Sequence, residues 1–221
     1  MTIKEYFGDW WKVLDHNVAL NTIKWLNTLN KDTLCPKINN VFKAFEVCKY
    51  NDCKAVFIGQ DPYPQRDVAT GLLFANNNSI TSPSLKVIRD SVCSLYNPYK
   101  IVTFDATMDY WTNQGILLLN SALTTEVGKV GVHINKWLEF IGKFIQNMSL
   151  YSPGIIYVLF GNQAKMLRGF IGKNNYVFTI EHPAYFARHN IDMPNKLWHD
   201  INNVVYKLYG NKIKWCKEIN I

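Results

Sequence analysis

The chain lacks the sequence signals of several common protein classes. No apolar run approaches the ~20 residues that a membrane-spanning helix needs, and the polar start at Thr2, Lys4 and Glu5 has no signal-peptide pattern. The five cysteines form no CxxC pair, and their odd number argues against a disulfide framework and against a zinc site. Because free cysteines suit a reducing compartment, we expect a soluble intracellular protein, cytoplasmic or, in a eukaryotic or viral host, nuclear.

Familiar loops for phosphates and cofactors are also missing. Neither GxGxxG nor GxxxxGK[ST] occurs, which leaves little support for a dinucleotide or P-loop site. His, Cys, Asp and Glu show no metal-ligand spacing, and no Ser or Cys stands beside a base in a nucleophile motif. These absences disfavour redox, nucleotide-driven and metal-dependent chemistry.

What is present is a basic, apolar chain of moderate length. The 221 residues are 48% hydrophobic and only 19% charged, which predicts one folded domain over residues 1–221 with an ample core. Lys and Arg number 24 against 17 for Asp and Glu, so the formal net charge is +7. Such a balance favours nucleic acid, an anionic membrane surface or an acidic substrate as partner, and charge alone does not choose among them.

Helical and strand-like patterns alternate along the chain. Residues 4–30 carry apolar side chains at helical spacing with a break near Asp15, and a short helix is expected through Val41 to Val47. Continuous apolar runs predict buried parallel strands at Ala55–Ile58, Ile116–Leu119, Ile155–Leu159 and Tyr176–Ile180. Further helices are expected at Ser84–Tyr96, Thr107–Gln114, Ile134–Met148, Gln163–Ile171 and Lys196–Tyr209. The alternation predicts a three-layer αβα domain.

Polar residues follow each predicted strand at the point where it ends. They are Gly59-Gln60-Asp61, Asn120-Ser121, Gly161-Asn162 and His182-Pro183, in chain order. Ligands of open parallel sheets bind beyond the carboxyl ends of the strands. The sequence therefore predicts that these segments converge on one cleft.

Asp61 and His182 are the titratable residues of this set. One carboxylate and one histidine suit a hydrolysis through an oxocarbenium-like sugar, in which the carboxylate stabilises the cation and a donor stabilises the leaving anion. Each residue taken singly has a simpler explanation: an Asp or His before Pro often belongs to a turn, and an Asn after a strand often caps a helix. Their joint arrival at one sheet edge favours the active-site interpretation.

Several ordered motifs resemble those of family-1 uracil-DNA glycosylases. The resemblance runs from about Pro36 to His182 with plausible spacing, and an ordered set is far more specific than one hexapeptide. The motifs are GQDPYP (Gly59–Pro64), GLLF (Gly71–Phe74), SPSL (Ser82–Leu85), LLLNSALT (Leu117–Thr124) and His182-Pro183, with further matches at Trp111–Leu119, Gly128–His133 with Trp137, and Leu159–Ala164.

This resemblance implies a single domain around a four-stranded, mainly parallel sheet, and cofactor-free, metal-free excision of uracil from single- or double-stranded DNA in base excision repair. Asp61 would orient water and stabilise the sugar cation, and a neutral His182 would donate to uracil O2. The uracil would flip out of the DNA duplex and stack on the ring of Phe74. Asn120 would hydrogen-bond the edge of the base, and Tyr63 would lie against its C5 position. Residues implied to complete the site are Gln60 near the base, Ser82, Pro83, Ser84, Gly161 and Asn162 near phosphates, Phe186 as a wedge in the duplex, and Arg188 near the backbone.

Departures from the family pattern gather near the end of the matched region. Pro64 stands where many members carry His, and Asn162 replaces a Ser. Ala184 and Ala187 lack hydroxyls that would bind phosphate, so we expect fewer side-chain contacts with the DNA backbone here. Phe186 occupies the position of a wedge that is usually Leu.

Three alternatives and some further expectations accompany this hypothesis. The first alternative is a DNA-binding relative serving as a replication accessory factor; the second is a glycosylase for mismatched thymine or damaged bases. The third is an unrelated α/β hydrolase of a small phosphorylated substrate. We expect a monomer with no membrane partner, and a basic DNA groove would offer a target for an acidic, DNA-mimicking protein inhibitor.

Overall fold

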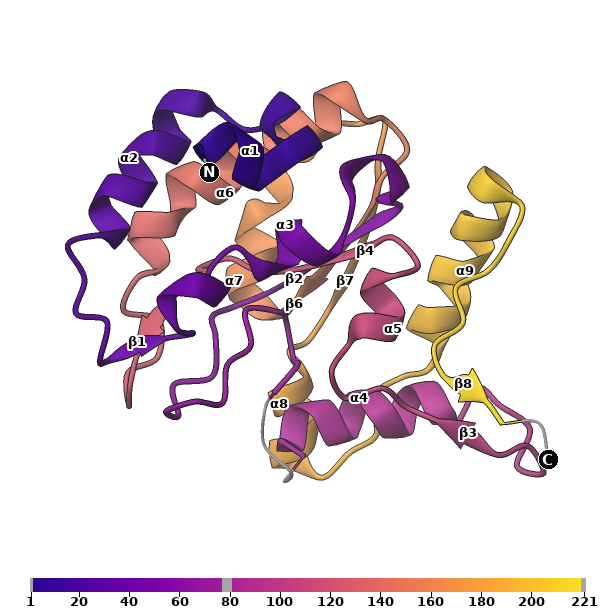
Figure 1. Ribbon diagram of the computed structural model, residues 1–221. Coiled ribbons are helices and arrows are strands. Elements are labelled where there is room, and N and C mark those ends of the chain that lie inside the picture. Colours follow the sequence, from indigo (N-terminus) through magenta and orange to yellow (C-terminus); the bar gives the residue numbers. More distant parts are fainter. Residues whose placement is uncertain (1, 77–80, 220–221) are drawn as a thin grey trace.

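Figure 1 shows the computed structural model, which describes residues 2–76 and 81–219. The helices are α1 (Ile3–Phe7), α2 (His16–Leu26), α3 (Lys43–Val47), α4 (Pro83–Cys93), α5 (Asp109–Thr112), α6 (Ile134–Tyr151), α7 (Gly161–Lys165), α8 (Pro183–His189) and α9 (Lys196–Tyr209). Short 3₁₀ turns lie at Gly8–Lys12, Ile38–Asn40, Tyr50–Asp52 and Met166–Phe170. The strands are β1 (Leu34–Cys35), β2 (Ala55–Gly59), β3 (Val102–Thr103), β4 (Ile116–Asn120), β5 (Thr125–Glu126), β6 (Ile156–Phe160), β7 (Tyr176–Ile180) and β8 (Lys217–Glu218).

The central sheet has four strands in the order β4-β2-β6-β7. All of its pairings are parallel, so the carboxyl ends of the strands lie along one edge. The register pairs Gly59 with Asn120 and Phe160 with Ile180 at that edge. This register brings the segments that follow the strands close together, as the sequence predicted.

Helices cover both faces of this sheet (Figure 1). On one side, the ring of Phe57 from β2 contacts Trp111 of α5, Trp198 of α9 and Trp215 of the C-terminal segment. On the other side lie α1, α2, α3 and α6. A cluster of aromatic side chains there joins the Gly8–Lys12 turn to α3 and α6. Its members are Trp10, Phe42, Phe45, Trp137, Phe140 and Phe144. Burial of such large rings supplies much of the hydrophobic stabilisation.

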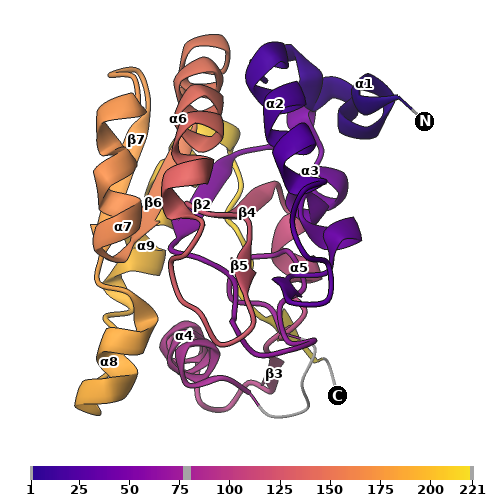
Figure 2. The same cartoon turned by 90° about the vertical axis from the view of Figure 1, so that its left-hand side faces the viewer.

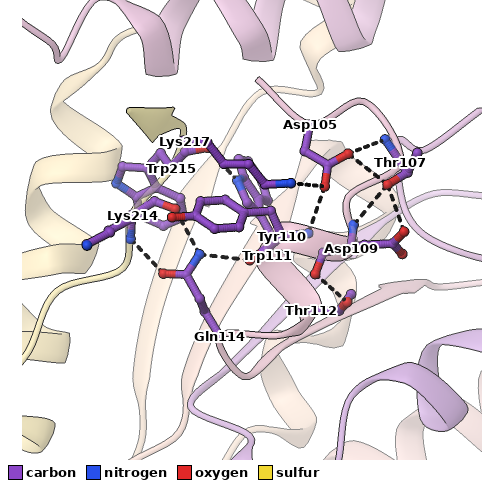
Figure 3. A network of polar contacts seen from close by, with 10 residues as sticks. All are labelled: Asp105, Thr107, Asp109, Tyr110, Trp111, Thr112, Gln114, Lys214, Trp215 and Lys217. Carbon is purple, nitrogen blue, oxygen red and sulfur yellow. Dashed lines mark hydrogen bonds and ion pairs between the residues drawn. The ribbon is translucent and has the colours of Figure 1, made fainter. Parts of the chain in front are cut away.

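The C-terminal segment is fastened to α5 by the polar contacts drawn in Figure 3. Gln114 exchanges two hydrogen bonds of 2.8 Å with the backbone of Lys214, and the indole N–H of Trp111 donates to the Trp215 carbonyl at 2.9 Å. The carboxylate of Asp105 accepts from Tyr110 N–H and lies 3.8 Å from Lys217 Nζ. These contacts hold Trp215 against the sheet, where it closes the core.

The predicted fold class is confirmed, with several local differences. The sheet is entirely parallel, and of its two edge strands β4 is buried along its whole length whereas β7 is half-buried. The helix expected at Gln163–Ile171 is instead α7 followed by a 3₁₀ turn, and the helix expected at Thr107–Gln114 shortens to α5. Among residues 2–76 and 81–219, no helix is both long and apolar enough to cross a bilayer.

Candidate active site

The strand ends meet at a cavity of about 340 Å³. Residues expected from the sequence line it from separate segments: Gln60, Asp61, Tyr63, Phe74, Ser84, Asn120, His182 and Arg188. Parallel register explains the convergence, because each segment leaves the sheet at the same edge. A cavity of this size is at the lower end of the range of small-molecule sites.

Asp61 follows β2 and is held by hydrogen bonds on both carboxylate oxygens. The Gly131 backbone N–H donates to Oδ2 at 2.5 Å, and the Gln60 side-chain amide donates to Oδ1 at 3.1 Å. Partial burial raises the pKa of Asp61 above its ordinary value, and these two donors act against that rise. The donors therefore favour the ionised form in a site whose desolvation opposes it.

His182 follows β7 and is the N-cap of α8. Its Nδ1 accepts a hydrogen bond from the Ala184 backbone N–H at 3.2 Å, so the proton of the neutral ring lies on Nε2. Burial, and secondly the positive charge of Arg188, lower the pKa of His182 to about 4. Near neutral pH the ring is thus a neutral donor that lines the cavity.

The close approach of β6 and β7 at His182 depends on a glycine. Gly161 has a φ of +80°, and a Cβ at that position would lie 2.9 Å from the His182 Cβ. A side chain at residue 161 would therefore meet both backbone strain and a steric clash.

Asn120 ends β4 and is only 7% exposed. Within the described residues, no protein group forms a hydrogen bond with its side-chain amide, which lines the cavity. A Cβ on the neighbouring Gly59 would lie 2.9 Å from Asn120 Oδ1, so the glycine leaves room for this amide. The Asn120 amide therefore faces the cavity with its donor and acceptor available to a ligand.

Tyr63 and Phe74 form the aromatic wall of the cavity. The Tyr63 hydroxyl donates to the Phe74 carbonyl at 3.1 Å and lies 2.7 Å from Ser82 Oγ. Phe74 has a φ of +64°, a conformation that non-glycine residues rarely adopt and that often marks functional sites. Its ring contacts those of Phe160 and His182 edge-on, at centroid distances of 5.1 and 5.6 Å.

The residues expected near phosphates occupy two helix N-termini. Ser82 caps α4 by accepting from Leu85 N–H, Pro83 is its first residue, and Ser84 lines the cavity. Ser82 and Pro83 line an adjoining hollow of about 580 Å³. Gly161 and Asn162 begin α7 and lie outside the cavity lining, although Gly161 packs against His182.

Residues 183–189, over which no helix was expected, form helix α8, which packs beside α4 in both views (Figures 1 and 2). Ala184 and Arg188 lie one turn apart on this helix and line the cavity. Phe186 is 7% exposed and faces the interior, whereas Tyr185 is 37% exposed. Insertion of Phe186 into a duplex would thus require its ring to leave this packing.

An NMR titration tests the electrostatics of His182. The midpoint is expected at about pH 4, because the buried ring resists protonation. Since protonation becomes easier when the guanidinium is removed, Arg188→Gln should move the midpoint to higher pH. Arg168→Gln, at an exposed arginine outside the cavity lining, should leave it unchanged. A wild-type midpoint near the ordinary 6.5 would contradict this assignment.

Several residues of the site were not identified from the sequence as functional, among them Ala69 in the cavity lining. Gly131 contributes a backbone donor to Asp61, and Val130 lines the cavity with an exposed side chain. A backbone N–H has no signature in a sequence. The motif at Gly128–His133 indicated that this segment belongs to the family pattern, but it did not predict the hydrogen bond from Gly131 or the place of Val130 in the cavity.

The geometry agrees with comparisons to known proteins. The profile of the family described as the Uracil DNA glycosylase superfamily matches residues 45–205. The chain belongs to the uracil-DNA glycosylase superfamily. The matched range contains every residue of the cavity lining.

Relatives in this superfamily match along most of their length. A uracil-DNA glycosylase of Mycoplasmopsis pulmonis is 33% identical over 192 residues, covering 86% of each chain. One of Fusobacterium nucleatum is 30% identical over 220 residues, covering 94% of this chain and 95% of the relative.

Solved structures confirm the fold. Mimivirus uracil-DNA glycosylase has a TM-score of 0.73 at 20% identity, covering 96% of this chain and 91% of its own. A variant of the mimivirus protein, solved in complex with UGI, also gives 0.73, at 21% identity, covering 97% and 94%. At these identities the likeness concerns the α/β architecture alone.

Proposed function

We propose that this chain hydrolyses the N-glycosidic bond of deoxyuridine in DNA, releasing uracil and leaving an abasic site in base excision repair. The observation that carries the proposal is the buried, unpartnered Asn120 amide in the same cavity as Asp61 and neutral His182. The names of the bacterial relatives support it.

The chemistry follows from the partners of these groups. The bond between C1′ and N1 breaks, and its electron pair stays on uracil. Water forms the new bond to C1′, and the proton that this water loses balances the charge of the uracil anion, which is released as neutral uracil. The ionised Asp61 stabilises the cationic sugar and orients the water. His182 Nε2–H donates a hydrogen bond to uracil O2 as negative charge develops there.

The remaining cavity residues would select and hold the base. The Asn120 amide accepts from uracil N3–H and donates to O4, which cytosine cannot match. Phe74 stacks on the ring, Tyr63 excludes a methyl group at C5, and Gln60 supports both Asp61 and the base. The proposed contacts with DNA are Ser82, Pro83, Ser84, Gly161, Asn162, Phe186 and Arg188.

The partner is uracil-containing DNA, single- or double-stranded. We propose that the protein acts on this DNA as a monomer. An acidic protein that mimics DNA would compete with DNA for this site, and the complex of a similar mimivirus protein with UGI supports such an inhibitor as a partner.

Oligonucleotides containing U, T or a G·T mismatch, with added chelator, test this function directly. After alkali treatment, strand breaks are expected at U alone. Breaks at mismatched T would support the related mismatch glycosylase. Retained DNA affinity without breaks at U would support the accessory-factor alternative and overturn the proposal.

A further inference from the structure

An exposed valine stands at the mouth of the cavity. Val130 is 64% exposed, yet it lines the cavity together with Asp61 and Asn120. Single exposed apolar residues are common on protein surfaces. This one is unusual because its neighbours in the lining are the polar groups to which chemistry is assigned.

The loop that carries Val130 is fixed to the segment containing Asp61 at two points. Gly128 N–H donates to the Pro64 carbonyl at 2.9 Å, and Gly131 N–H donates to the Asp61 carboxylate. A hydrogen bond of 2.5 Å from Thr125 Oγ1 to the Lys129 carbonyl also closes the loop on itself. Val130 is therefore held at a defined place beside Asp61.

This placement determines which part of a nucleotide Val130 would meet. Under the proposed function, Asp61 faces the sugar carbon C1′, while the base occupies the cavity beside Asn120. Val130 precedes Gly131, whose N–H donates to Asp61, and Val130 therefore borders the deoxyribose. Arg188 and Ala184 of α8 belong to the same lining.

We infer that Val130 is a substrate-contacting residue whose methyl groups pack against the deoxyribose of the flipped-out nucleotide. The inference rests on the proposed function for the location of the sugar. The contact buries apolar surface of both partners and excludes bulk solvent from the sugar, while the single water that Asp61 orients stays in place. Excluding bulk solvent there strengthens the attraction between the carboxylate and the sugar cation.

Matched valine-to-alanine variants test the inference. Val130→Ala removes about two methyl groups from the contact and should lower kcat/KM for uracil release, and affinity for uracil-containing DNA, each about tenfold. Val132→Ala is the control, because Val132 is 45% exposed on the same loop but does not line the cavity. The control should stay within about twofold of wild type, and both variants should unfold at the wild-type temperature.

The outcomes separate this inference from the proposed function. If wild type releases uracil and Val130→Ala behaves like Val132→Ala, the contact is wrong while the function stands. If wild type releases no uracil, the function is wrong, and the affinity comparison still decides whether Val130 touches DNA. A Val130→Ile variant that retains wild-type affinity would further support an apolar contact.

Discussion

An Asp61→Asn variant should release uracil about 10²–10³-fold more slowly than wild type and bind DNA with nearly unchanged affinity. The amide keeps the size of the carboxylate and can still accept the Gly131 N–H bond, but it lacks the charge that stabilises the sugar cation. Single-turnover rates and fluorescence anisotropy with a uracil-containing duplex measure the two effects separately. The loss is expected in kcat, because the charge acts mainly in the transition state.

The matched control is Asp192→Asn, an exposed aspartate outside the cavity lining. It removes the same charge from the same protein and should leave the rate within about twofold of wild type. This separates local stabilisation at Asp61 from a change in net charge. A rate for Asp61→Asn within about threefold of wild type would remove Asp61 from the mechanism.

Burial favours the protonation state that the proposed reaction needs at His182 and opposes the one that it needs at Asp61. It lowers the pKa of His182, which favours the neutral donor that the leaving uracil needs. The same desolvation raises the pKa of Asp61, which opposes the ionised form. Asp61 therefore needs the hydrogen bonds from Gln60 and Gly131 to favour its ionised form. His182 needs no such help, because burial itself favours its neutral form.

The main architecture was predictable because local patterns agree with the fold. The continuous apolar runs at Ala55–Ile58 and Ile116–Leu119 match strands β2 and β4, which are buried along their whole length. The expected break near Asp15 is the N-cap of α2, where Asp15 accepts from Val18 N–H. The cleft followed from parallel strand order, since polar residues after each strand share one edge.

Helix α8 was missed although the sequence carries signals for it. Pro183 is well suited to the first helical position, and Asn190 ends the helix in a left-handed conformation. Burial of Phe186 depends on packing between α8 and α4, which no local pattern contains.

Other features of the site depend on tertiary contacts alone. The Gly131 donor reaches Asp61 across 70 residues of sequence. The left-handed backbone of Phe74 and the protonated nitrogen of His182 are likewise set by neighbours in space. Motifs thus identified the side chains of the site, while the structure supplied their protonation and orientation.

Asn120→Asp should change which base the cavity accepts. Uracil presents a donor at N3 and an acceptor at O4, and the Asn120 amide matches both. An ionised carboxylate has no donor for O4, so uracil release should fall by about 10²-fold or more. A protonated carboxyl group would donate to cytosine N3 and accept from its amino group, so cytosine release should appear and should increase as pH falls.

The measurement is the ratio of uracil to cytosine release from otherwise identical oligonucleotides. Asn120→Ala is the control, because it removes the same uracil contacts and offers no match to cytosine. Both variants should lose uracil release, and only Asn120→Asp should gain cytosine release. If the ratio for Asn120→Asp equals that of wild type, Asn120 does not read the base edge, and the unpartnered amide must serve another ligand.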